Sequence, residues 1–264
     1  MAWITPPPSR TILTLFGFDI MWYGVLIATG IFLGVFVGSK MAKHFGESEE
    51  DFTSMMIWAI VAAIIGARLY YVIFNASWYL ENPGQILNIR QGGLAIHGGI
   101  LAALLVVWIY TKKKNLPFLT MGDAAMPGLA LGQAIGRWGN FFNQEAYGGP
   151  TDLPWGMWID GQTVHPTFLY ESIVTFLLFL FLLWYGKNKR KQPGELMAIY
   201  GIVYGFARFI IEGLRTDSLY FLNLRVAQIV SLAFVALGVA GLIHLKRRKE
   251  VGPPKKGRKN QRTK

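Results

Sequence analysis

The chain has 264 residues, of which 53% are hydrophobic and only 16% are charged, and its formal net charge is +11. Its apolar residues fall in long runs that neither alternate as strands do nor leave a solvent-facing helix stripe, which excludes a water-soluble domain and predicts an all-α, polytopic membrane protein. The absence of Cys excludes disulfides, thiolate metal sites and a thiol nucleophile belonging to the chain itself.

Seven segments are long enough to cross about 30 Å of hydrocarbon as helices. In chain order they are residues 21–39, 52–74, 94–110, 119–137, 166–185, 194–214 and 226–245. The fourth is the least apolar because it contains Asp123, Pro127 and Gln133, and its assignment depends on the charges on either side of it. We therefore expect a single transmembrane domain over residues 1–245 and a disordered basic tail over residues 246–264.

The distribution of Lys and Arg predicts the orientation of these spans. The segments after the first, third and fifth spans, together with the tail, contain nineteen basic residues, whereas the alternate segments contain four, Arg10, Arg90, Arg137 and Arg215. Because cytoplasmic loops are rich in basic residues, the N-terminus is expected outside and the C-terminus in the cytoplasm, with a small extracytoplasmic region between spans four and five. This topology accounts for the positive charge, so we expect no nucleic-acid partner, and the tail is expected to rest on anionic lipid.

Glycines recur at four-residue spacing in two of the spans. They are Gly30, Gly34 and Gly38 in the first span and Gly128, Gly132 and Gly136 in the fourth. In lipid, this spacing lets helix backbones approach closely, so we interpret both series as helix-packing surfaces.

The predicted orientation gathers polar side chains in one leaflet. Tyr23, His97 and Glu171 lie near the outer ends of spans that run inward, and Arg137 and Arg208 lie in the outer halves of spans that run outward. Ionisable groups inside a membrane are costly and face the bundle interior or a water-filled cavity. The outer end of the bundle is therefore the candidate functional site.

The spacing of Arg208, Glu212 and Arg215, by four and then three residues, places all three on one face of a helix. That face is expected to look into the bundle, where the pair Arg208 and Glu212 is either a structural ion pair or part of a site.

Three other polar residues allow two interpretations each. Arg68 either binds a carboxylate or carbonyl that closes the bundle or belongs to the site. His97 is flanked by Gly92, Gly93, Gly98 and Gly99 and is either structural or close to a ligand. Asp123 lies at the inner end of its span and is interpreted as a helix cap or a packing partner.

Four ordered motifs resemble those of the bacterial prolipoprotein diacylglyceryl transferases, and the resemblance covers all seven spans. In this sequence they are Gly92-Gly93-Leu94-x-x-His97-Gly98-Gly99, Gly136-Arg137-x-Gly139-Asn140-Phe141-x-Asn143-x-Glu145 with Gly148, His165-Pro166-Thr167-x-Leu169-Tyr170-Glu171, and Arg208-Phe209-x-x-Glu212-x-x-Arg215-x-Asp217.

The resemblance implies transfer of the diacylglyceryl group of phosphatidylglycerol to the thiol of the lipobox cysteine of a preprolipoprotein. The products are a thioether and glycerol phosphate. It also implies that residues 1–245 form the catalytic domain, that the enzyme lies in the bacterial cytoplasmic membrane with its active site toward the outer leaflet, and that no cofactor or metal takes part.

The resemblance places essential roles on Tyr23, His97, Arg137, Asn140, Glu145, Gly148 and Arg208. We assign Arg137 and Arg208 to the lipid phosphate, because a guanidinium offers a planar set of donors that suits phosphate oxygens. His97 is the candidate base for the thiol, with Tyr23 as its hydrogen-bonding partner, and Tyr23 and Glu145 are the alternative bases. Asn140 and Glu145 are expected to orient the head group or the arginines. The remaining candidates for substrate binding are Asn143, Gly148, Glu171, Glu212 and Arg215.

A lipid or anion transporter, or a flippase, is the alternative from another functional class. Such proteins favour a site near the bilayer midplane, inverted repeats and access from both faces. Here the polar residues gather in the outer half and the sequence contains no visible repeat, so the sequence favours the transferase.

Overall fold

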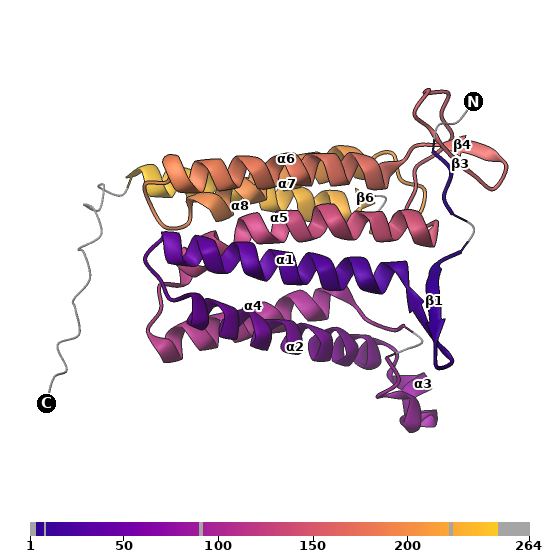
Figure 1. Cartoon of the computed structure of the whole chain (residues 1–264), viewed down its shortest axis with the longest axis horizontal. Coiled ribbons are helices and arrows are strands. Elements are labelled where there is room, and N and C mark those ends of the chain that lie inside the picture. Colours follow the sequence, from indigo (N-terminus) through magenta and orange to yellow (C-terminus); the bar gives the residue numbers. More distant parts are fainter. Residues whose placement is uncertain (1–3, 8, 90–91, 222–223, 248–264) are drawn as a thin grey trace, which may run out of the picture.

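The computed structural model describes residues 4–7, 9–89, 92–221 and 224–247. Within them, seven helices of 18 to 26 residues run along a common axis (Figure 1). They are α1 (Trp22–His44), α2 (Glu49–Phe74), α4 (Ile96–Lys114), α5 (Phe118–Asn143), α6 (Thr167–Asn188), α7 (Glu195–Glu212) and α8 (Val226–Arg247). A short helix α3 (Ala76–Glu81) and a 3-10 turn η1 (Pro83–Gln85) lie between α2 and α4.

The chain is mostly helical, as predicted, but the prediction of an all-α chain missed three antiparallel hairpins. They are β1 (Thr11–Leu15) with β2 (Phe18–Met21), β3 (Met157–Ile159) with β4 (Gln162–Val164), and β5 (Tyr220–Phe221) with β6 (Leu224–Arg225). Strands of two to five residues are too short for an alternating pattern to emerge from the sequence. All three hairpins lie at one end of the bundle, which we call the hairpin end; the turns after α1, α4 and α6 lie at the other, the turn end (Figure 1).

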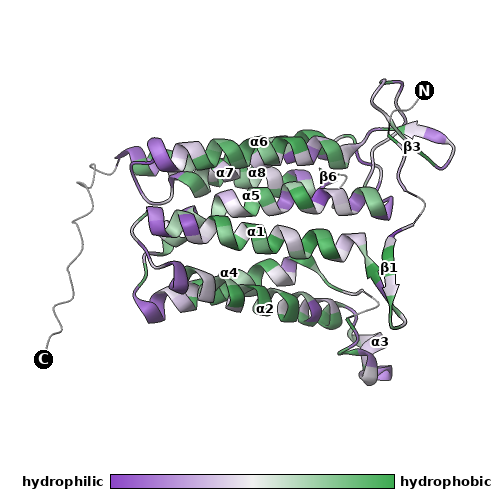
Figure 2. Ribbon diagram, in the orientation of Figure 1, coloured by the Kyte–Doolittle hydropathy of each residue, from purple (hydrophilic) through white to green (hydrophobic). Residues whose placement is uncertain are grey.

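Each of the seven segments predicted from the sequence coincides with a long helix. Five of the described helices, α1, α2, α4, α6 and α8, are long and apolar enough to cross a membrane. The other two, α5 and α7, carry Arg137 and Arg208. Figure 2 shows hydrophobic residues along the middle of the helices and hydrophilic residues toward their ends.

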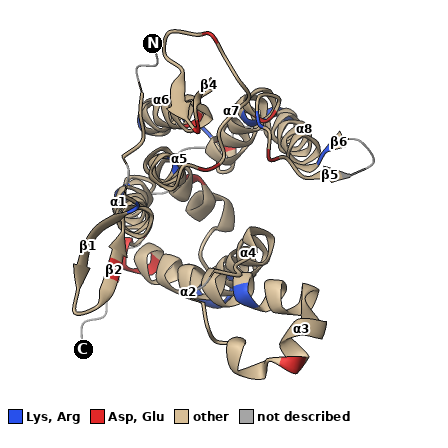
Figure 3. Cartoon of the chain, turned by 90° about the vertical axis from the view of Figure 1, so that its right-hand side faces the viewer, with Lys and Arg blue, Asp and Glu red and all other residues tan. Residues whose placement is uncertain are grey.

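The seven long helices form a central pair with one group of helices on each side. In Figures 1 and 3, α1 and α5 lie between the pair α2 and α4 on one side and the group α6, α7 and α8 on the other. The glycine series explains the central contact: a Cβ atom on Gly34 would lie 2.8 Å from the carbonyl oxygen of Gly128, and one on Gly30 would lie 3.1 Å from that of Gly132. The prediction that these glycines bring helix backbones together is confirmed for Gly30, Gly34, Gly128 and Gly132, whereas Gly38 and Gly136 lie closest to the side chains of Phe52 and Ile27.

The larger of two buried apolar clusters lies toward the turn end. Its members come from α1, α2, α5, α6 and α7 and are Met41, Ala42, Phe52, Met55, Met121, Ala124, Ala130, Leu178, Phe179, Leu182 and Leu196. A smaller cluster at the hairpin end joins the β3–β4 hairpin to the start of α6 through Met157, Ile159, Val164 and Phe168.

Asp123 joins the turn end of α5 to the start of α7. Its side chain is fully buried and accepts hydrogen bonds from the backbone N–H groups of Gly194 (2.8 Å) and Met197 (3.0 Å) and from Nε of Arg190 (2.7 Å). A carboxylate at this place satisfies free N–H groups of a helix N-terminus. The interpretation of Asp123 as a helix cap is confirmed, although the helix that it caps is α7.

Arg68 organises the segment between η1 and α4. Its guanidinium donates five hydrogen bonds of 2.6 to 3.0 Å to backbone carbonyls, those of Gln85, Ile86, Asn88, Gly92 and Gly93. Only 8% of the residue is exposed. Of the two interpretations of Arg68, the structure supports closure of the bundle through carbonyl groups.

The predicted tail, residues 246–264, falls almost wholly outside the described residues. Only Lys246 and Arg247 are described, and they end α8.

Candidate active site

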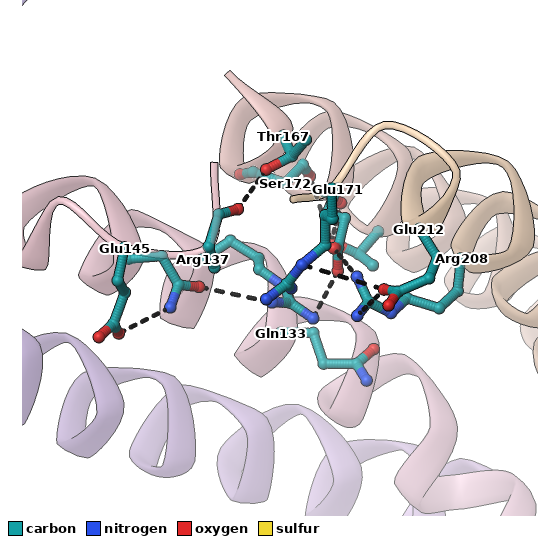
Figure 4. A network of polar contacts seen from close by, with 12 residues as sticks. Gln133, Arg137, Glu145, Thr167, Glu171, Ser172, Arg208 and Glu212 are labelled. Carbon is teal, nitrogen blue, oxygen red and sulfur yellow. Dashed lines mark hydrogen bonds and ion pairs between the residues drawn. The ribbon is translucent and has the colours of Figure 1, made fainter. Parts of the chain in front are cut away.

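Glu171, at the hairpin end of α6, lies between two arginines of neighbouring helices (Figure 4). Its Oε2 lies 2.5 Å from Nη2 of Arg137 on α5, and its Oε1 accepts a hydrogen bond from Nη1 of Arg208 on α7. The side chain of Glu171 is 4% exposed, whereas those of Arg137 and Arg208 are 23% and 15% exposed. One buried carboxylate therefore serves both arginines and joins three helices.

Further carboxylates extend this cluster beyond the end of α7. Nη2 of Arg208 lies 2.5 Å from Oε2 of Glu212, and Nε of Arg215 lies 3.9 Å from the same oxygen. Arg215 also donates hydrogen bonds of 2.9 and 2.7 Å to Asp217, which holds the pKa of that carboxyl below its ordinary value. α7 ends at Glu212, earlier than predicted, but the turn that follows keeps Arg215 beside that residue: the N–H of Arg215 donates to the carbonyl of Glu212 over 3.2 Å. The predicted gathering of Arg208, Glu212 and Arg215 is therefore present, although Arg215 lies outside the helix.

The cluster can accept an additional anion. Its three arginines balance the carboxylates of Glu171, Glu212 and Asp217, so its formal charge is zero. A guanidinium has five N–H donors, and the Nε–H groups of Arg137 and Arg208 donate to none of the described residues. Because both side chains are also partly exposed, an anionic group could bind them without displacing Glu171. Figure 3, which looks at the hairpin end, shows basic and acidic residues together on α5, α6 and α7.

Asn140 links the arginines to Glu145. Nη1 of Arg137 donates to Oδ1 of Asn140 over 3.4 Å, and Nδ2 of Asn140 donates to Oε1 of Glu145 over 3.0 Å. Nδ2 of Asn143 donates to the same oxygen over 3.3 Å. The structure thus brings together Arg137, Asn140, Asn143 and Glu145, as the sequence predicted, and leaves Glu145 exposed, with no described residue hydrogen-bonded to its Oε2.

The loop that carries Glu145 is held in an unusual backbone conformation. Gln144 and Ala146 have φ values of 55° and 59°, in the left-handed region that non-glycine residues rarely adopt. The hydroxyl of Thr167 donates to the carbonyl of Ala146 over 2.5 Å and fixes this turn to the start of α6.

Gly148 joins three segments that converge beside the cluster. Its N–H donates to the carbonyl of His165 over 2.9 Å, and the next N–H, of Gly149, donates to the carbonyl of Leu214 over 3.0 Å. A Cβ atom on Gly148 would lie 2.7 Å from the Cβ of His165 and 2.9 Å from the Leu214 oxygen. Gly148 is buried and allows close packing, so it supports the site instead of lining it.

Tyr23 lies against α5 beside the candidate site. A Cβ atom on Gly139 would lie 2.4 Å from Cδ2 of the Tyr23 ring, so the glycine between Arg137 and Asn140 makes room for this tyrosine. The neighbouring Trp22 stacks on Phe142 with 4.6 Å between ring centroids. Tyr23 is 40% exposed and could still contact a ligand.

His97 is the one essential candidate that the structure does not bring into the cluster. It is exposed in the first turn of α4, and its ring centroid lies 6.3 Å from that of Tyr70 on α2. No hydrogen bond joins it to Tyr23 or to another described residue. Of the flanking glycines, Gly98 and Gly99 serve helix packing: a Cβ atom on Gly98 would lie 2.3 Å from the carbonyl oxygen of Gly66, and one on Gly99 would lie 3.1 Å from that of Ala63.

The sequence interpretation missed several supporting contacts. Nη1 of Arg225 donates to the carbonyl of Glu212 and caps α7. Trp138 donates over 3.1 Å to the hydroxyl of Ser172, which donates over 2.8 Å to the carbonyl of Ala134. A hydroxyl in an apolar helix is common and gives no signal by itself. Within the described part of the chain, His, Asp and Glu side chains form no group of three or more that could hold a metal ion.

Five apolar helices of spanning length, with an arginine–carboxylate cluster at one end of the bundle, define a helical membrane protein. Residues 10–244 match the sequence model of the prolipoprotein diacylglyceryl transferases. The chain belongs to that family and is therefore a transferase.

Curated relatives agree with this assignment. The phosphatidylglycerol–prolipoprotein diacylglyceryl transferase of Finegoldia magna is 53% identical over 243 residues, which cover 92% of this chain and 97% of the relative. The enzyme of the same name from Clostridioides difficile is 51% identical and covers 91% and 96%, and that from Thermosynechococcus vestitus is 46% identical and covers 86% and 88%. None of these findings supports the transporter or flippase alternative.

Proposed function

We propose that this protein transfers the diacylglyceryl group of phosphatidylglycerol to the lipobox cysteine of preprolipoproteins, and that the chemistry takes place at the Arg137–Glu171–Arg208 cluster. We place the active site here because two partly exposed arginines share one buried carboxylate. The family and the names of the relatives supply the reaction.

The reaction needs positive charge where the leaving group forms. The cysteine sulfur attacks the methylene carbon of the diacylglyceryl group that is bonded to the phosphate oxygen. An S–C bond forms, the C–O bond breaks, and its electron pair stays on the oxygen of the departing glycerol phosphate. Arg137 and Arg208 would bind the phosphate and stabilise the charge that develops on it.

Glu171 and Glu212 are positioning residues in this proposal. Each fixes terminal nitrogens of Arg208, and Glu171 also holds Arg137, so both guanidinium groups are oriented before the lipid arrives. Preorganised donors cost little reorganisation during the reaction. Asn140, Asn143 and Glu145 form the adjacent edge of the site, where the glycerol head group would lie.

The thiol must lose its proton to a base. His97 remains the proposed base, because a neutral imidazole suits a thiol with a pKa of about 8.5. His97 makes no described contact with the cluster, so in this proposal the peptide brings the thiol to it. Glu145, with its exposed carboxylate, and Tyr23 are the alternatives.

The membrane arrangement is part of the proposal. We propose that α5 and α7 also cross the membrane, which gives seven spans, and that the hairpin end faces outward from the bacterial cytoplasmic membrane. Support comes from the basic residues at the turn end, among them Lys40, Lys43, Lys112, Lys113, Lys114, Lys187, Lys189, Arg190 and Lys191. The active site would then meet the outer leaflet and the exported peptide.

The function is tested with the full-length protein in liposomes that contain phosphatidylglycerol. A lipobox peptide should gain one diacylglyceryl group through a thioether, detected by mass spectrometry. The same peptide with Ser in place of Cys should gain nothing. An unmodified Cys peptide in liposomes that hold folded protein would contradict the proposal.

A further inference from the structure

A polar pair that the proposed reaction does not use lies between α5 and α7, farther from the hairpin end than the arginines. The hydroxyl of Tyr200 donates a 2.8 Å hydrogen bond to Oε1 of Gln133. Tyr200 also stacks on Tyr204, with 5.3 Å between ring centroids. Nε2 of Gln133 donates to none of the described residues, and a half-buried donor is costly unless it meets an acceptor.

Gln133 lies one helical turn farther from the hairpin end than Arg137. The two residues are four positions apart, so they share a face of α5 and are separated by about 6 Å along its axis. In Figure 4, Gln133 lies below Arg137 and extends away from Glu171. Leu129, one further turn toward the turn end on the same face, is 45% exposed. This face therefore presents a guanidinium, an amide and an alkyl group in order of depth.

The same order describes a glycerophospholipid from its phosphate inward, with phosphate first, ester carbonyls next and acyl chains last. An ester carbonyl accepts hydrogen bonds and cannot donate them, and the amide of Gln133 has a free donor. We propose that Nε2 of Gln133 donates to an ester carbonyl of the diacylglyceryl group whose phosphate lies on Arg137 and Arg208. This inference rests on the function proposed above.

The contact would act on the reacting carbon. The methylene whose C–O bond breaks lies between the phosphate and the esters, so anchors on both sides restrict its position before the thiol attacks. The hydroxyl of Tyr200 is hydrogen-bonded to Oε1 of Gln133 and takes no part in the contact proposed for Nε2. The site would therefore distinguish a diacyl lipid from a dialkyl lipid of the same charge.

The test compares two donors of matched chain length, diacyl phosphatidylglycerol and its ether-linked dialkyl analogue, which lacks the carbonyl oxygens. Transfer to the lipobox peptide is measured as kcat/KM for each. Wild-type protein should prefer the diacyl lipid by roughly 3- to 10-fold, the value of one hydrogen bond. Gln133→Met keeps the side-chain length without the donor and should lose this preference. Its kcat/KM with the diacyl lipid should fall to the wild-type value for the dialkyl lipid, and its kcat/KM with the dialkyl lipid should not change.

Tyr200→Phe is the matched control, because it breaks the same interhelical hydrogen bond and leaves the amide in place. It should retain most of the preference. Gln133→Asn, which keeps an amide but shortens it, provides a second variant if Gln133→Met does not fold, and it should also lower the preference.

Three results would overturn the inference. The first is equal kcat/KM for both lipids in wild-type protein, and the second is a preference that persists in Gln133→Met. The third is an equal loss of kcat/KM with both lipids in Gln133→Met and in Tyr200→Phe, which would indicate that the pair serves helix packing alone. Transfer from both lipids without a preference would leave the proposed function intact. No transfer from either lipid would overturn the proposed function and this inference with it.

Discussion

Replacing Arg137 by Lys separates the binding of phosphate from the simple presence of positive charge. In the structure, Arg137 makes one ion pair, with Glu171, and one long hydrogen bond of 3.4 Å, with Asn140. A Lys ammonium could keep the ion pair with Glu171, so we expect folding to change little. It could not offer two parallel donors to a phosphate.

The expected loss follows from the donor that Lys cannot replace. A hydrogen bond to a charged group contributes about 1.5–3 kcal/mol, and each 1.36 kcal/mol corresponds to a factor of about ten in rate. Arg137→Lys should therefore lower kcat/KM for phosphatidylglycerol by roughly 10- to 200-fold. The assay is transfer to a lipobox peptide at varied lipid fraction, with the melting temperature measured on the same preparation.

Arg68→Lys is the matched control at the same end of the bundle. Arg68 donates to five carbonyls, and an ammonium has three donors, so at least two of these carbonyls would lose their protein partner. Each lost hydrogen bond costs about 0.5–1.5 kcal/mol. We expect a lower melting temperature for Arg68→Lys and near-normal kcat/KM per folded molecule.

The opposite pattern would refute this reasoning. If Arg137→Lys kept wild-type kcat/KM, charge attraction alone would suffice and the bidentate role would be wrong. If Arg68→Lys lost activity without losing stability, Arg68 would belong to the active site.

Three further predictions concern the base, the packing and the topology. His97→Gln should lower turnover by about 10²- to 10⁴-fold with an unchanged KM for lipid. Alkaline pH should partly restore turnover, because the thiol of pKa about 8.5 then ionises unaided, and absence of rescue would assign the base to another residue. Gly139→Ala places a Cβ atom 2.4 Å from a facing tyrosine ring and should lower the melting temperature, whereas Gly136→Ala, with 3.3 Å to the end of a flexible isoleucine, should be tolerated; equal melting temperatures would contradict the packing. Lys189→Cys should react with membrane-impermeant maleimide only from the cytoplasmic side and Asp152→Cys only from outside, and the reverse pattern would invert the proposed topology.

The sequence predicted the long helices because each is defined locally by a run of apolar residues. It also predicted that the glycines of α1 and α5 would pack, since four-residue spacing has a direct geometric meaning in a helix. It could not predict the role of Arg68, because the five carbonyls that bind its guanidinium become neighbours only when residues 85–93 fold around it. The hairpins escaped prediction because their strands are very short.

The sequence predicted most residues of the candidate site but not the contacts between them. Residues close together in sequence, such as Arg137, Asn140 and Glu145, were grouped correctly because one helix end and the next turn carry them. The shared counter-ion Glu171 required the relative placement of three helices, which no local pattern encodes. Helical spacing placed Arg215 beside Glu212 correctly but extended the helix too far, because α7 ends at Glu212 and a turn carries Arg215.

The central claim is that the phosphate of the donor lipid binds Arg137 and Arg208, and photo-cross-linking tests it directly. Wild-type protein in liposomes would be irradiated with phosphatidylglycerol that carries a diazirine on its head-group glycerol, and the adducts would be mapped by mass spectrometry. We expect adducts in the segments from Arg137 to Glu145 and from Arg208 to Asp217, and unlabelled phosphatidylglycerol should compete them away. Competable adducts confined to the loop around Arg68, or to the turn end, would contradict the account.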